Sequence, residues 1–289
     1  MKGKQTTKTL KETDGNQTFK VNTEAVKSML KKAENSKVMF VILIGSYQTG
    51  KSSKIARLID SKDVVIGDGI HETTEGAYIY GPVSLNDLKE RFDCFPDDSD
   101  DTVIFFIDTE GANGFNTGNS PEETTYLISQ FIAPYAALAN IIVTTSECNV
   151  VDSTVKSMEQ MIDIFQKVRS VGNFNEPVIL NIINDCQLLK EGEDNCNAKN
   201  QINGIFVKRS SQIYNNTFPL PPFNEHGIFY NSCFADFAKE LISITHQNSD
   251  QPIIKYISFC GSFMLLIYSF YTTFTGFSKY FNEKSYEML

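Results

Sequence analysis

The chain has 289 residues, of which 41% are hydrophobic and 12% aromatic, so it can bury a large core. Aspartate and glutamate number 35 against 26 lysines and arginines, which gives a formal net charge of -9, and no basic stripe offsets this excess. Nucleic acid is excluded as an expected partner, because Lys and Arg neutralise the phosphates in most such complexes.

The N-terminal segment, residues 1–20, is polar throughout and lacks the apolar core of a signal peptide. We expect it to be a loose tail in front of the folded domain. The six cysteines show no CxxC pair and no metal-ligand spacing with the three histidines. We expect them to be reduced core thiols in a protein that faces the cytosol.

Apolar, β-branched runs alternate along the chain with stretches of helical spacing. The runs that predict strands are residues 38–44, 77–80, 102–107, 140–145, 177–183 and 227–230. The stretches that predict helices are residues 52–59, 121–138 and 154–171. Several of the runs are apolar on both faces, as in a sheet that is covered by helices on each side. The alternation therefore predicts an α/β fold with a mainly parallel central sheet and helices on both of its faces.

A loop that contains two glycines joins the first buried strand to the first helix. It reads GSYQTGKS, the pattern GxxxxGKS in the strand-to-helix setting of a phosphate loop, and so predicts a P-loop NTPase. The glycines let the backbone N–H groups point at the α- and β-phosphates, Lys51 reaches the β- and γ-phosphate oxygens, and Ser52 offers a hydroxyl to Mg²⁺. The residues of this segment expected to contact the nucleotide are Gly45, Ser46, Tyr47, Gln48, Thr49, Gly50, Lys51, Ser52 and Ser53.

Two further segments complete the expected phosphate and metal site. The strand TVIFFI is followed by DTEG, which puts Asp108 at the carboxyl end of a strand, where it can hold Mg²⁺, usually through water. The amide of Gly111 can contact the γ-phosphate. Between the two motifs, the polar stretch GDGIHETTEG places Thr74 to complete the Mg²⁺ shell when a γ-phosphate is present. The expected metal ligands are thus Ser52, Thr74 and Asp108.

These three motifs, in this order and spacing, resemble the large GTPase domain of guanylate-binding proteins and atlastins, within the dynamin superfamily. The resemblance covers roughly residues 20–270. It implies that GTP is the substrate, that Mg²⁺ is the cofactor, and that the chain hydrolyses GTP to GDP and phosphate. It also implies a nucleotide-dependent homodimer that forms through the GTPase face. The residues that it places in catalysis are Lys51, Gln48, Thr74 and Gly111.

The family reads guanine with an Arg-Asp pair at the end of a later strand, and not with the NKxD of small GTPases. This chain has no NKxD and offers PVILNIIND, in which Asp185 occupies the matching position. The resemblance implies that Asp185 accepts hydrogen bonds from guanine N1 and N2, which an adenine cannot donate. Asn184 stands where the family has the arginine, so that a charged contact becomes a neutral one.

A second departure from the family concerns the rate. Family members place a catalytic arginine inside the phosphate loop, and Gln48 stands at that position. A neutral amide cannot neutralise the charge that develops in phosphoryl transfer, and such an arginine is typically worth ~10³–10⁵ in rate. We therefore expect slow turnover, unless another arginine such as Arg57 or Arg91 substitutes. The alternative is a non-catalytic, nucleotide-gated switch that recruits a partner.

The uncharged run at residues 256–278 is long enough to span a bilayer. Residues 253–269 alone would make a buried helix, since residues 272–276 suit a turn, and the resemblance favours this second reading. We expect a cytoplasmic protein, with peripheral association or a short anchor at an intracellular membrane as the alternative. The expected organisation is a polar tail over 1–20, a GTPase domain over 21–270, and a C-terminal extension over 271–289 where a helical middle domain would begin.

Overall fold

The computed structural model describes residues 4–11, 17–21, 23–45, 49–64, 66, 77–94, 100–109, 135, 139–147, 177–192, 195–198, 200–201, 216–222 and 227–248. Its strands are β1 Lys4–Lys11, β2 Gln17–Val21, β3 Lys37–Gly45, β4 Ala77–Ser84, β5 Thr102–Thr109, β6 Ile141–Glu147, β7 Val178–Asn184 and β8 Asn216–Pro219. The helices with described bounds are α1 Thr23–Lys31, α2 Lys51–Ile59, α3 Leu85–Arg91 and α7 Gly227–Asn248.

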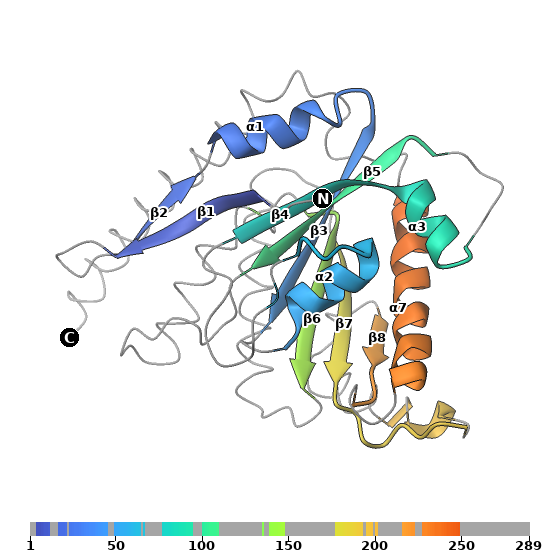
Figure 1. The fold of residues 1–289 in the computed structure, drawn as a ribbon. Coiled ribbons are helices and arrows are strands. Elements are labelled where there is room, and N and C mark those ends of the chain that lie inside the picture. The colour runs from blue at the N-terminus through green and yellow to red at the C-terminus, as the bar shows by residue number, and fades with distance from the viewer. Residues whose placement is uncertain are drawn as a thin grey trace, which may run out of the picture.

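The described strands form one sheet in the order β2-β1-β4-β5-β3-β6-β7-β8 (Figure 1). Strands β5, β3, β6, β7 and β8 run parallel to one another. Strands β4, β1 and β2 extend the sheet beyond β5 in antiparallel pairings. The first five predicted strands are found as β3 to β7 and the predicted helix 52–59 as α2. The prediction of an α/β fold with a mainly parallel central sheet is confirmed.

Strand β3 lies in the middle of the parallel part and is buried along nearly its whole length. The chain places β5 on one side of β3 and, later, β6 on the other side. In open α/β sheets, ligands bind at the carboxyl ends of the strands, where the strand order changes side in this way. Because β3 ends at Gly45, the fold puts the start of the GSYQTGKS loop at this place.

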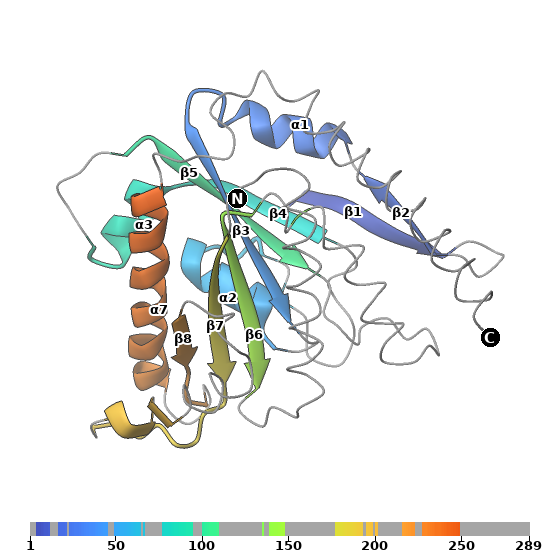
Figure 2. The ribbon, with the colours of Figure 1, turned by 180° about the vertical axis from the view of Figure 1, so that it is seen from behind.

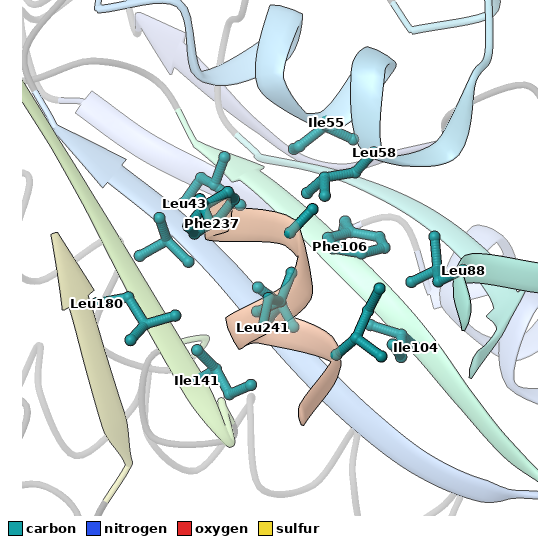
Figure 3. Close-up of a cluster of buried hydrophobic side chains, with 14 of the residues drawn as sticks. Leu43, Ile55, Leu58, Leu88, Ile104, Phe106, Ile141, Leu180, Phe237 and Leu241 are labelled. Carbon is teal, nitrogen blue, oxygen red and sulfur yellow. The ribbon is translucent and has the colours of Figure 1, made fainter. Parts of the chain in front are cut away.

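One face of the sheet shares a hydrophobic core with α2, α3 and α7. Figure 3 shows Leu43 and Phe106 of the sheet together with Ile55 and Leu58 of α2 and Phe237 of α7. All five side chains are fully buried, and burying a side chain of this size contributes about 1.5–3 kcal/mol. This core holds α2, and with it the loop that precedes α2, against the sheet.

The opposite face of the sheet is apolar and buried as well. Phe40 and Phe105 stack there with ring centroids 5.6 Å apart, and Ile42 and Ile107 beside them are 0% and 1% exposed. Of the predicted helix 121–138, the structure describes Tyr135, which is helical and buried. The predicted helix 154–171 lies outside the described residues.

The prediction of a strand at residues 227–230 is wrong, because these residues are the first turn of α7. Seen from behind in Figure 2, α7 runs along the sheet beside β8 as one long helix. Its buried side chains include Tyr230, Phe234, Phe237 and Leu241, which recur at helical spacing. An apolar run of four residues cannot distinguish a strand from a helix, and the repeat that decides the matter lies beyond it.

Residues 4–11 and 17–21 form strands where a loose tail was expected. Strand β1 pairs with β4, and β2 pairs with β1 at the outer edge of the sheet. Strands near the edge of a sheet are held by backbone hydrogen bonds and need few apolar side chains, while threonines such as those of KQTTKTLK in β1 favour the extended conformation. A polar composition alone therefore did not identify this edge of the sheet.

Within the described part of the chain, no helix is both long and apolar enough to cross a membrane. The run at 256–278 and the extension at 271–289 lie outside the described residues, so the alternatives for them stay predictions. Among the described cysteines, Cys94, Cys186 and Cys233 are buried free thiols, whereas Cys196 is exposed.

Candidate nucleotide-binding site

Four neighbouring parallel strands bring the predicted motifs to one edge of the sheet. Gly45 ends β3 and pairs with Thr145 of β6. Asp108 lies near the end of β5, level with Leu43 of β3. Asn184 ends β7 next to β6. The phosphate loop, the acidic strand end and the expected base-reading residues therefore meet at the same edge.

The two glycines that bracket the loop are each required by the local geometry. A Cβ atom at Gly45 would lie 2.3 Å from both the backbone oxygen and the side-chain oxygen of Thr145, so only a glycine lets β3 and β6 approach this closely. Gly50 has φ 70° and is the N-cap of α2, and this left-handed conformation carries little penalty only for glycine. Residue 51 can then begin the helix directly behind the loop.

Lys51 lies across the phosphate loop. Its ammonium donates to the carbonyl of Gly45 at 3.3 Å, and the residue is only 7% exposed. The side chain thus turns back from the first residue of α2 to the end of β3, which is the path that a lysine over bound phosphates must take. Ser46, Tyr47 and Gln48, between these two ends, lie outside the described residues.

Ser52 and Asp108 connect the loop to the acidic strand end. The Ser52 hydroxyl donates to Oδ2 of Asp108 at 2.6 Å, and Asp108 is fully buried. A hydroxyl and a carboxylate are the hard oxygen ligands that Mg²⁺ prefers, and Mg²⁺ bound with phosphates needs only one or two protein ligands. The residues therefore fit this ion. Thr74, the third predicted ligand, and Gly111 lie outside the described residues.

The expected base-reading residues lie at the end of β7. The side-chain amide of Asn184 donates to the carbonyl of Thr49 at 3.0 Å, which links β7 to the phosphate loop. Asp185 follows with φ 55° and an exposed side chain, a conformation that aspartate tolerates better than most residues. Cys186 then donates its N–H to the carbonyl of Leu220 at 2.9 Å, which anchors this turn to the segment after β8.

Two residues of the site were not predicted. Lys54, one turn into α2, donates to the carbonyl of Thr49 at 2.8 Å and is 3% exposed. Burial lowers the pKa of Lys54 to about 7, the charges of Lys51 and Arg57 add to this effect, and Asp185 opposes it. Thr145 shares a hydrogen bond of 2.6 Å between its hydroxyl and that of Thr49. The one available signal for Lys54 was its position four residues after Gly50, which brings its side chain back toward the loop.

Ser53, which the sequence places among the nucleotide contacts, lies in the first turn of α2 and is half-buried.

The two arginines named as substitutes for an arginine at position 48 make other contacts in this structure. Arg57 donates to Asn231 at 2.7 Å and lies 5.0 Å from the centre of the Tyr230 ring, so it is directed toward α7. Arg91 donates to the carbonyl of Leu58 at 2.7 Å. Either side chain would have to leave these contacts before it could act at the phosphates.

Comparison with known proteins identifies a family for this chain. A solved structure of Toc33 from Arabidopsis thaliana, in a dimerisation-deficient mutant, is similar with 13% sequence identity and a TM-score of 0.45, covering 78% of this chain and 90% of that chain. No curated protein sequence matches this chain significantly. The family described as guanylate-binding protein, N-terminal domain, matches residues 16–174, which are more than half of the chain and contain the phosphate loop and the acidic strand end. The chain therefore belongs to the guanylate-binding protein family.

Proposed function

We propose that this domain binds GTP with Mg²⁺ and hydrolyses it to GDP and phosphate. The observation that carries the proposal is the 2.6 Å contact between Ser52 and Asp108, with Lys51 lying across the loop beside it. This contact joins the phosphate loop to a buried carboxylate at the edge of the sheet where nucleotides bind in such folds. The match to a GTPase-type family supports the choice of GTP.

At the phosphates, the chain supplies positive charge and hydrogen-bond donors. Lys51 and the N-terminus of α2 would neutralise the phosphate oxygens, and the loop amides would orient them. Ser52 would hold Mg²⁺ directly and Asp108 would hold it through water, with Thr74 as a further ligand. Bound Mg²⁺ neutralises charge on the β- and γ-phosphates. Gln48 and Gly111 are proposed to face the γ-phosphate.

At the base, Asp185 is proposed to accept hydrogen bonds from guanine. Its exposed side chain follows β7, two strands away from β3 in the sheet order. A nucleotide with its phosphates at Gly45 can therefore extend its base across the end of β6 toward Asp185. The neutral Asn184 beside it is proposed to support the loop and not to contact the base, because its amide is engaged with Thr49.

We propose that hydrolysis is slow, because Gln48 replaces the arginine and because Arg57 and Arg91 are held in other contacts. The same contacts favour a second candidate, a switch that binds GTP and recruits a partner without turnover. In either case we propose a homodimer that forms through the nucleotide-binding face, and a cytoplasmic location with membrane association as the alternative. The proposed domain spans 21–270, extended toward the N-terminus by β1 and β2.

Calorimetric titration with non-hydrolysable GTP and ATP analogues in Mg²⁺ tests the binding proposal. We expect the guanine analogue alone to bind, and Lys51→Ala to lose this binding. Equal binding of both analogues would point to a general nucleotide-binding ATPase, and binding of neither would reject the proposal.

Multiple-turnover phosphate release separates the slow enzyme from the switch. We expect slow release that Lys51→Ala abolishes, and that Gln48→Arg accelerates because it restores a charge at the transferring phosphate. Brisk release that is unchanged in Gln48→Ala would show that catalysis does not run through position 48. Release no faster than in Lys51→Ala would identify the switch.

A further inference from the structure

One carbonyl oxygen, that of Thr49, accepts hydrogen bonds from two different elements. Lys54 of α2 donates to it at 2.8 Å and Asn184 of β7 donates to it at 3.0 Å. Thr49 precedes Gly50, the N-cap of α2, so its carbonyl belongs to the peptide that joins Thr49 to Gly50 at the end of the phosphate loop. The two donors therefore connect the phosphate loop with the strand end that leads to Asp185.

The side chain of Thr49 is fixed as well. Its hydroxyl and that of Thr145 lie 2.6 Å apart, and both residues are buried. Thr49 is thus attached to α2, β6 and β7 at once. A residue held from three directions in a packed interior cannot shift without moving its partners, because such interiors transmit strain.

Lys54 occupies a buried position where an apolar side chain would cost less free energy of desolvation. Its neighbour Ile55 and the nearby Leu58 are fully buried in the core, and Lys54 itself is 3% exposed. An ammonium at such a site loses its hydration, so it needs a hydrogen-bond acceptor, and the Thr49 carbonyl at 2.8 Å supplies one. Lys54 therefore lies in the core with its ammonium directed at the Thr49 carbonyl.

We propose that Lys54 is a positioning residue for base selection. Together with Asn184 it holds the Thr49 carbonyl and sets the position of Asp185 relative to the phosphate loop, so that one nucleotide can satisfy both ends of the site. Lys54 itself touches neither the base nor the phosphates. This inference rests on the proposed function, since it assumes that the loop holds phosphates and that Asp185 reads guanine.

The variants Lys54→Met, Lys54→Arg and Asn184→Ala test this role. Lys54→Met keeps the length of the side chain and removes its donor, and Lys62→Met is the matched control because Lys62 is exposed in the turn after α2. The measurements are the affinities for a non-hydrolysable GTP analogue, for the matching ATP analogue and for inorganic tripolyphosphate, all with Mg²⁺. Thermal unfolding of each variant checks that it folds.

We expect Lys54→Met and Asn184→Ala each to weaken binding of the GTP analogue about tenfold, the usual effect of one lost hydrogen bond of a charged or clamping group. Binding of tripolyphosphate should change less than about twofold, so the preference for guanine over adenine falls. Lys54→Arg should recover most of that preference. In an Asp185→Ala background, Lys54→Met should no longer alter GTP-analogue binding, since its effect runs through Asp185.

Three results would overturn the inference. Equal losses of GTP-analogue and tripolyphosphate binding would place Lys54 at the phosphates. Behaviour identical to Lys62→Met would make it a buried lysine without a role in selection. An undiminished effect of Lys54→Met in the Asp185→Ala background would break the link to the base. If the wild-type chain binds tripolyphosphate but shows no preference for guanine, the proposed GTP specificity itself is rejected. That result comes from the wild type, so it is distinct from the three results above, which come from the variants.

Discussion

Two polar clusters lie at opposite ends of the sheet, and they differ in whether their hydrogen bonds stabilise the charged side chain that each contains. The phosphate-end cluster, at the carboxyl ends of the strands, consists of Thr49, Lys54, Thr145 and Asn184. The amino-end cluster, where β5 begins and α7 ends, consists of Asn86, Lys89, Asp100, Thr102 and His246. Both combine a charged side chain with several hydrogen bonds, so the difference between them lies in what those bonds do.

In the amino-end cluster the hydrogen bonds are made to the charged group itself, the carboxylate of Asp100. Thr102 donates its N–H to Asp100 at 2.9 Å, and Nδ1 of His246 lies 3.2 Å from the same carboxylate. Burial opposes the charged form of Asp100, yet the bonds from Thr102 and His246 and the charge of Lys89 outweigh it and lower the pKa of Asp100. The same Nδ1 lies 3.3 Å from Nζ of Lys89, so it donates to Asp100 when protonated and accepts from Lys89 when not.

In the phosphate-end cluster the hydrogen bonds are made to the backbone of the phosphate loop. The donors of Lys54 and Asn184 go to a neutral carbonyl, and the pKa of Lys54 falls because burial is not compensated. A lowered carboxyl pKa adds stability at neutral pH, whereas a lowered ammonium pKa removes it. The amino-end cluster therefore stabilises the fold, whereas the buried ammonium of Lys54 in the phosphate-end cluster lowers the stability. Functional sites commonly contain such destabilising groups.

The largest expected effect tests how tightly the phosphate end is packed. Gly45→Ala should lower the free energy of unfolding by about 3 kcal/mol or more, since overpacking costs about 1–3 kcal/mol and a side chain at the φ of 154° that Gly45 adopts costs about 1–3 kcal/mol. The contact at fault is the 2.3 Å approach to the Thr145 oxygen. Urea unfolding measures it. Gly192→Ala is the control, because Gly192 has φ 78° but open space around it, so it should show the φ cost alone. Equal losses in the two variants would contradict the packing argument.

The next effect concerns the bond that joins the two motifs. Ser52→Ala should weaken nucleotide binding about 10–100-fold in Mg²⁺, the usual cost of disturbing a metal site. Calorimetry in Mg²⁺ and in EDTA measures the difference. In EDTA the variant and the wild type should bind alike, since the lost hydroxyl acts through the metal. A loss of the same size in EDTA would mean that Ser52 contacts the phosphates and not the ion.

The pH dependence of stability contrasts the two clusters directly. The unfolded lysine keeps its proton to about pH 10.5 while native Lys54 releases it at about 7, so the unfolded state binds more protons between these values. The free energy of unfolding of the apo protein should therefore rise from about pH 7 to about pH 8.5, by up to about 1.4 kcal/mol per pH unit. Comparison with Lys54→Met by urea unfolding in EDTA isolates this term. Parallel pH curves for the two proteins would show that Lys54 is not desolvated.

The smallest effect belongs to the amino-end cluster and has the opposite direction. Asp100→Asn should lower the free energy of unfolding at neutral pH by about 1–2 kcal/mol, since it weakens charge-assisted hydrogen bonds. The native pKa of Asp100 lies below the unfolded value of about 3.9, so this contribution is present above that pH. It is lost as the pH falls through the native pKa.

Asp101→Asn is the matched control for this variant. Its carboxylate is 63% exposed and lies 3.9 Å from Lys37, so a change below about 0.5 kcal/mol is expected. Urea unfolding at neutral and acid pH measures both variants. A difference between wild type and Asp100→Asn that persists in acid would assign the effect to packing instead of charge.

Much of the phosphate end could be predicted because its rules are local. Gly50 and Lys51 stand in a strand-to-helix turn whose backbone conformation depends on neighbouring residues. The strands around it are buried on both faces and so appear as continuous apolar runs. Asn184 and Asp185 follow such a run, so their place at the same edge as Gly45 could be predicted from the parallel order alone.

Other elements could not be predicted from their own short segments, because residues outside those segments decide their secondary structure. The helix α7 begins with GIFY, which fits a strand until Phe234 and Leu241 establish a helical repeat. Strand β1, which lies between the edge strand β2 and β4, is polar, and it is held by pairing with β2 and with β4, which lies far along the chain. Propensity and periodicity describe single segments, so a partner strand or a later turn of a helix can overrule them.

By itself, the sequence determined that this chain is an α/β domain with a phosphate loop, because glycine placement and apolar period act over a few residues. The tertiary structure alone decided that Thr49 is held by Lys54, five residues away, and by Asn184, 135 residues away. It also decided that Gly45 must be a glycine because of Thr145, on another strand. Convergence of this kind depends on how helices and strands pack against one another, and packing is a property of the folded core.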